Sequence, residues 1–169
     1  MTEVLQHRVL ALERVFTEIA HTRMQGVPVL NTAVHIQALG FVHDPEDTKL
    51  LTGILVTPWF MNLLRLPRSA SDSATDLLTV GQKTRRTFGN ESFEFTGACE
   101  IDLGAFEVCS LFSPMFEFAN HAAAVDTASE ILRLLRSSPQ PATMAAAPLP
   151  SRRGFLFGRG APAASRTLA

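Results

Sequence analysis

The period of the apolar residues changes twice along the chain, and this order limits the folds that are open to it. Apolar residues first recur at steps of three and four, which is typical of one face of an amphipathic helix. These residues are Leu5, Val9, Leu12, Phe16 and Ile19. A second helical stripe runs through Ala124, Ala128, Ile131 and Leu135. Between the two stripes the apolar residues alternate or run together, as they do in strands.

About five strands are expected between the helices, at 34–38, 50–56, 84–88, around 93–95 and around 106–108. Because no long helical pattern separates these strands, they are expected to form a mainly antiparallel sheet. The sequence therefore predicts an α+β fold in which the N-terminal and C-terminal helices pack on one face of the sheet.

The 169 residues suit one domain, predicted at 1–137, followed by a Pro/Ala-rich linker and a disordered basic tail at 138–169. Residues 1–130 hold 16 acidic and nine basic residues, a net charge of −7, whereas residues 131–169 hold six arginines and no acid. An acidic body favours a cationic partner, or the chain's own tail, and argues against nucleic acid. No apolar stretch is long enough to enter a membrane, and Met1-Thr2-Glu3 does not begin a secretory signal.

Gly104-Ala105 is predicted to be a two-residue hairpin turn that places Cys99 opposite Ser110. In this register one face of the hairpin is apolar and the other is acidic. The apolar face would carry Phe95, Cys99, Ile101, Phe106 and Val108, and the acidic face Glu94, Glu100, Asp102, Glu107 and Cys109. Cys99 and Cys109 would then lie on opposite faces and form no disulfide, with Cys99 in the core and Cys109 either a structural thiol or a contact residue.

Two segments repeat one pattern, in which a strand is followed by Ser/Thr-Pro and large apolar residues. A hydroxyl followed by proline is typical of a helix start, so each strand is expected to run into a helical turn. The turns would present Pro58, Trp59, Phe60, Met61, Pro114, Met115, Phe116 and Phe118. If both strands end at one edge of the sheet, these side chains either line a groove for apolar helices or simply cover the core.

Patterns for catalysis or metal binding are weak. The five histidines share no metal-ligand spacing, and the chain has no Cys-x-x-Cys pair, phosphate loop or nucleophile elbow. No enzyme activity, cofactor or metal is therefore expected. One alternative remains open, in which Cys109 and the nearby carboxylates hold or protect a metal centre.

Four segments together resemble the HybE/HupJ family of nickel–iron hydrogenase assembly chaperones, in family order up to residue 159. They are Thr52–Leu63, Phe93–Phe95, Cys109–Met115 and Arg152–Arg159. Two departures are the absence of the Cys-x-x-Cys pairs of a fused rubredoxin and the presence of Gly89-Asn90 where a Pro-containing turn is expected.

The resemblance implies a cytoplasmic, non-enzymatic factor that delays the export of an uptake hydrogenase until its metal centres are installed. Its partners would be the twin-arginine signal peptide of the small-subunit precursor, the large subunit, or both, together with other maturation proteins. A twin-arginine leader is cationic and then apolar, which suits an acidic body with a possible apolar groove. Glu94, Glu100 and Glu107 are the predicted contacts for its arginines.

The tail carries Ser151-Arg152-Arg153-Gly154-Phe155-Leu156, which reads like the core of a twin-arginine leader. No apolar stretch follows it, so it is not an export signal. We hypothesise that Arg152, Arg153 and Phe155 mimic the client and occupy the chain's own site. As a flexible coil, the linker would span roughly 20 Å. The alternative is an ordinary basic tail that contacts the client or nothing.

Overall fold

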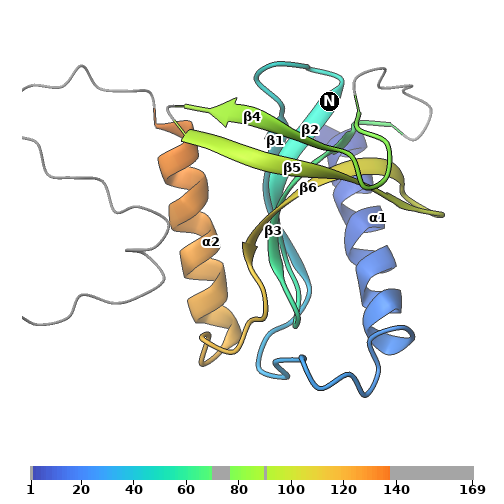
Figure 1. The fold of residues 1–169 in the computed structure, drawn as a ribbon, viewed down its shortest axis with the longest axis vertical. Coiled ribbons are helices and arrows are strands. Elements are labelled where there is room, and N and C mark those ends of the chain that lie inside the picture. The colour runs from blue at the N-terminus through green and yellow to red at the C-terminus, as the bar shows by residue number, and fades with distance from the viewer. Residues whose placement is uncertain (1, 70–76, 90, 138–169) are drawn as a thin grey trace, which may run out of the picture. The chain divides into compact units, whose positions relative to one another are not determined.

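The computed structural model describes residues 2–69, 77–89 and 91–137. A six-stranded antiparallel sheet, in the order β1-β2-β3-β6-β5-β4, lies between an N-terminal and a C-terminal helix (Figure 1). The helices are α1 (Thr2–His21) and α2 (His121–Arg136). The strands are β1 (Gln37–His43), β2 (Leu50–Val56), β3 (Met61–Pro67), β4 (Lys83–Phe88), β5 (Glu91–Glu100) and β6 (Gly104–Phe112).

This arrangement confirms the predicted antiparallel α+β fold. The described residues belong to one compact unit, Met1–Ser138. The predicted linker and basic tail, 138–169, lie outside the described residues. Neither described helix is long and apolar enough to cross a membrane.

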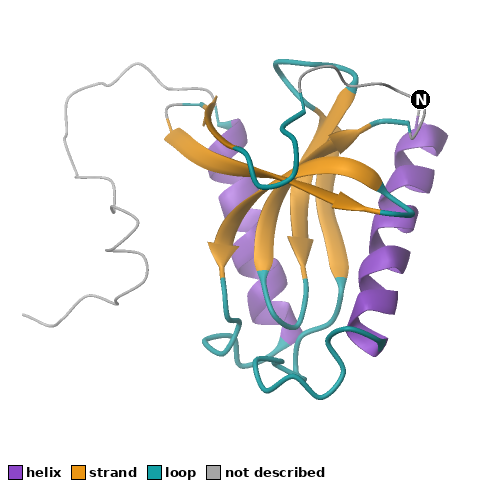
Figure 2. Cartoon of the chain, turned by 45° about the vertical axis from the view of Figure 1, so that its right-hand side comes forward, coloured by secondary structure: helices purple, strands orange, loops and turns teal. Residues whose placement is uncertain are grey.

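The two helices cover opposite faces of the sheet, so the prediction that both pack on one face is wrong (Figure 2). In β2, Leu51 and Leu55 pack in the core beneath α1, whereas Ile54 and Val56 pack in the core beneath α2. We call these two faces the α1 side and the α2 side. A continuous apolar run such as 50–56 is typical of a strand that is buried on both faces, and such a strand needs a cover on each side.

The sixth strand, β3, was not expected from the sequence. All seven of its residues are buried, so its side chains show no polar and apolar alternation. In the sequence, the preceding Thr57-Pro58 pair also favours a helix start at this point. In the structure, residues 57–60 instead connect β2 to β3 as a hairpin, with Val56 opposite Met61.

The register predicted for the β5–β6 hairpin is also wrong. Cys99 pairs with Ala105 and not with Ser110, and the connection is the three-residue turn 101–103. Gly104, with φ of +81°, takes the left-handed position that closes such a turn. The partner of Cys99 moves from position 110 to position 105, an odd number of residues, so every β6 side chain lies on the other face, relative to β5, from the one predicted. Ile101 is consequently fully exposed at the turn.

The cysteines follow the corrected register. Cys99 is exposed and not in the core, whereas Cys109 is buried on the α2 side. Cys99 and Cys109 form no disulfide with each other, as predicted.

On the α2 side, two carboxylates and two arginines of the described residues form a buried network that joins β3, β4 and β6 to Asp44, the residue after β1. Arg65 Nε donates to Asp44 Oδ2 at 2.7 Å, and Arg65 Nη1 donates to Glu107 Oε2 at 2.9 Å. Arg86 donates to both oxygens of Glu107 at 2.6 Å. Among these four described residues, the positive and negative charges are equal in number.

Residues 78–82 cover the network. The backbone N–H of Leu78 donates to Glu107 Oε1, and Gly81 and Gln82 form backbone hydrogen bonds with Gly97. A Cβ atom at position 97 would lie 2.1 Å from the carbonyl oxygen of Thr79. Only glycine therefore lets this segment lie so close to β5.

Burial alone would raise the pKa of the Asp44 and Glu107 carboxyl groups. At Asp44 the hydrogen bonds from Arg65 and Thr52 outweigh burial, and at Glu107 those from Arg86, the Leu78 N–H and Arg65 do so. Both carboxyl groups therefore have a pKa below its ordinary value in the folded chain. A lowered carboxyl pKa stabilises the folded state at neutral pH.

Removing one charge from the network should strongly destabilise the fold. We expect Glu107→Gln to lower the free energy of unfolding by about 3 kcal/mol, because it removes a buried negative charge that both Arg65 and Arg86 contact. Glu94→Gln, which breaks only the exposed ion pair with Lys83, should cost about 0.5 kcal/mol or less. Urea denaturation of both variants measures this difference, and equal losses would contradict the structural role of the network.

The stability difference between the wild-type chain and Glu107→Gln should depend on pH. The Glu107 charge stabilises the fold above the unfolded carboxyl pKa of about 4, and this contribution is lost as the pH falls through the lower folded pKa. The difference should stay constant from about pH 7 to pH 5 and narrow below about pH 4. Urea denaturation series at several pH values measure it, and a difference that widened in acid would have the wrong sign.

Candidate partner-binding surface

Asn31 ties together three loops at one edge of the sheet. Its backbone N–H donates to the Pro58 carbonyl at 2.8 Å, and its Nδ2 donates to the carbonyls of Met115 and Phe118 at 2.9 and 2.8 Å. We call this edge, formed by residues 27–34, 57–60 and 113–118, the sheet base. The two repeated segments therefore end at the same edge, which was the condition set for a shared surface.

The segments do not form the expected helical turns. Thr57 Oγ1 accepts from the backbone N–H groups of Trp59 and Phe60, at 3.3 and 2.9 Å, and donates to the Phe60 carbonyl. The hydroxyl thus makes the contacts of a helix cap but closes a hairpin. Residues 113–118 form turns and no helix.

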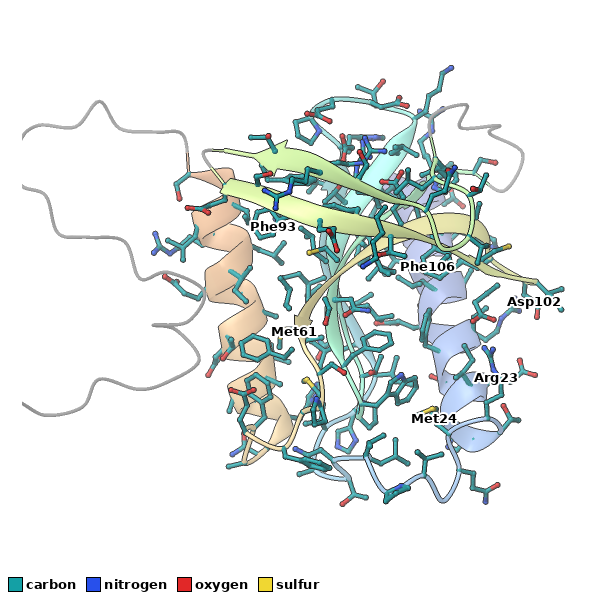
Figure 3. The ribbon with its side chains drawn as sticks, in the orientation of Figure 1. Arg23, Met24, Met61, Phe93, Asp102 and Phe106 are labelled. Atoms are coloured by element: carbon teal, nitrogen blue, oxygen red, sulfur yellow. The ribbon has the colours of Figure 1, made fainter. Side chains whose placement is uncertain are left out.

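The large side chains of the sheet base divide between the two sides of the sheet and do not converge into one groove. Trp59 and Phe60 lie on the α1 side, where Phe60 packs edge-on against Phe16 at 5.8 Å between ring centroids. Met61, Met115 and Phe118 are buried in the α2-side core. Figure 3 shows the same division, with Met61 towards α2 and Phe106 towards α1.

Some of the predicted apolar residues remain accessible at the sheet base. Phe116 is 59% exposed and Pro114 is exposed, whereas Pro58, Trp59 and Phe60 are half-buried. Asn31 fixes the backbone on which they lie. The sheet base therefore presents an apolar surface that the core packing leaves partly open.

The three predicted acidic contacts do not share a face. Glu94 and Glu100 lie on the α1 side, where they pair with Lys83 at 3.1 Å and with Arg23 at 2.8 Å. Glu107 lies on the α2 side, is fully buried and makes the network described above. Only Glu94 and Glu100 are placed where a partner can reach them.

The α1 side of β4, β5 and β6 forms a second accessible surface, which we call the open face. Among the described residues, its exposed side chains are Lys83, Arg85, Thr87, Ser92, Glu94 and Ser110, and its half-buried ones are Thr96, Ala98, Glu100 and Val108. Asn62 follows the 57–60 hairpin and pairs with Ser110, so it connects the open face to the sheet base. The open face and Asn62 thus lie on the same side of the sheet as Trp59 and Phe60.

Among the described residues, no group of side chains around Cys109 is placed to hold a metal ion, as the metal-handling alternative requires. Cys109 is buried among apolar residues beneath α2. Within 2–69, 77–89 and 91–137, no three His, Cys, Asp or Glu side chains are placed to hold a metal ion.

Sequence reasoning missed Asn31, Asn62, Asp44 and Arg65. An asparagine or an isolated charge carries no pattern of its own, and the roles of these residues depend on contacts far apart in the chain. The predicted contacts Arg152, Arg153 and Phe155 lie outside the described residues.

The family model described as "[NiFe]-hydrogenase assembly, chaperone, HybE" matches residues 7–158. The chain belongs to this family. The residues that match the family model include Arg152 and Arg153 of the tail.

Individual relatives agree with this membership. The chain is 50% identical to Protein HoxT of Cupriavidus necator, over 90% of this chain and 89% of that protein. It is 36% identical to the hydrogenase expression/formation protein HupJ of Bradyrhizobium diazoefficiens, over 85% and 83% of the two chains. The solution structure of HybE from Escherichia coli shares the fold, with a TM-score of 0.59 and 22% identity over 92% of this chain and 91% of that one.

Proposed function

We propose that this chain binds the precursor of a nickel–iron hydrogenase subunit in the cytoplasm and holds it until its metal centres are installed. Membership of a hydrogenase assembly chaperone family supports a hydrogenase client. The binding surface is the sheet base together with the open face. The chain itself carries out no reaction on the client.

The observation that carries this proposal is the exposed Phe116 on a backbone held by Asn31. Large apolar side chains that stay open on a rigid edge are suited to an apolar segment of a partner. Trp59, on the neighbouring loop, adds a half-buried aromatic ring that packs edge-on against Phe60. Such a surface accepts an apolar segment without unfolding the core.

The client segment we propose is the twin-arginine leader of the small subunit. Its arginines would meet Glu94 and Glu100 on the open face, and its apolar part would cover the sheet base. The net charge of −7 on residues 1–130 favours the approach of a cationic leader. The tail segment with Arg152, Arg153 and Phe155 remains a proposed competitor or additional contact for the same site.

The proposal predicts that Trp59→Ala and Phe116→Ala each weaken leader binding about tenfold or more, since apolar anchors carry much of an interface's energy. Leu134→Ala is the matched control, because Leu134 is similarly exposed (53%) but lies on α2. Affinity is measured by titrating each folded variant with a peptide of the leader.

Urea denaturation of the same variants separates binding from folding. If Trp59→Ala and Phe116→Ala lower the stability but leave the affinity for the leader peptide unchanged, Trp59 and Phe116 serve the core and not the binding surface. Wild-type chain that binds the large subunit but no leader peptide would restrict the client to the large subunit.

A further inference from the structure

Asn62 carries a buried oxygen that accepts no hydrogen bond from any described residue. The residue is only 8% exposed and lies in β3, between Leu55 of β2 and Ser110 of β6. Its Oδ1 atom is buried and accepts no hydrogen bond within the described part of the chain. Burying a carbonyl oxygen that accepts no hydrogen bond lowers the stability of the folded chain.

The other buried polar side chains of the described residues are partnered. Arg8 donates to the carbonyls of Pro67 and Leu103, and Thr52 donates to Asp44. Arg65, Glu107 and Thr57 make the hydrogen bonds given above. The fold satisfies its buried polar groups elsewhere, so the orphaned oxygen of Asn62 needs its own explanation.

The fold itself does not require a polar side chain at this position. Leu64 and Leu66, the next residues of β3 on the same side, are buried leucines in the α1-side core. A leucine at position 62 would continue this row and leave no polar atom without a partner. An asparagine here therefore lowers the stability of the free chain.

The position of Asn62 suggests which molecule supplies the donor. Asn62 lies where the apolar sheet base meets the open face, on the same side as Glu94 and Glu100. A guanidinium group has five N–H donors and no acceptor, so it can donate to an amide oxygen and to a carboxylate together. A rotation of the amide about its last side-chain bond is enough to turn the oxygen towards the surface.

We propose that Asn62 Oδ1 accepts a hydrogen bond from an arginine of the bound hydrogenase precursor. This inference rests on the proposed function and adds a specific acceptor to it. The asparagine lowers the stability of the free chain and raises its affinity for an arginine-bearing segment.

The test is Asn62→Leu, examined for stability and for binding. Asn62→Leu should raise the urea midpoint, because it removes the orphaned oxygen and buries more apolar surface. It should also weaken binding of a twin-arginine leader peptide about tenfold. Thr127→Val is the control, because Thr127 is half-buried on α2, where its hydroxyl donates to the Ala123 carbonyl.

A second peptide, with leucine in place of both arginines, has no side-chain donor at these two positions and identifies the donor. Wild-type chain and Asn62→Leu should bind this peptide equally, because the interaction that Asn62 makes is absent in both cases. An equal loss on both peptides would show that the donor is not arginine.

The remaining outcomes also decide the matter. A lower urea midpoint for Asn62→Leu would mean that the oxygen already has a partner in the free chain, and unchanged affinity would remove Asn62 from the site. If the wild-type chain has no affinity for the leader peptide, the proposed leader binding itself is wrong. If the wild-type chain and Asn62→Leu bind the leader peptide equally well, only the proposed role of Asn62 is wrong.

Discussion

The burial of β2 and β3 on both faces is the constraint on which the rest of the structure depends. Each face of these central strands needs a cover, and α1 and α2 supply one each. On the α1 side, the side chains of β4 and the first half of β5 stay exposed, and Thr96, Ala98 and Val108 are half-buried. The open face is therefore a consequence of how one helix covers half of a six-stranded sheet.

The two ends of β3 are built differently. Its C-terminal half carries Arg65, whose charge is neutralised by the buried carboxylates of Asp44 and Glu107. Its N-terminal end lies at the sheet base, where Asn31 holds loops that keep apolar side chains accessible. A buried charge network at one end and a fixed apolar edge at the other suit the proposed role, in which the chain binds a client while its own core stays intact.

The sequence predicted the helices and the antiparallel sheet, because amphipathic stripes and strand periods are local patterns. It did not predict β3, whose fully buried residues have no period, or the hairpin register, which Leu103 and Gly104 set through the turn. It left open whether the large apolar residues line a groove or cover the core, and in the structure Phe116 is exposed and Trp59 half-buried, whereas Met61 and Met115 belong to the core. Asn62 could not be predicted, since an unpartnered oxygen is visible only once its surroundings are known.

The central claim is that the client binds the sheet base and the open face. Backbone chemical shifts of the isotope-labelled chain, recorded by NMR during titration with a twin-arginine leader peptide, test it most directly. The largest shift changes should gather at residues 57–62, 94–100 and 108–118, with little change along α2. Changes centred on α2, or none at saturating peptide, would contradict the claim.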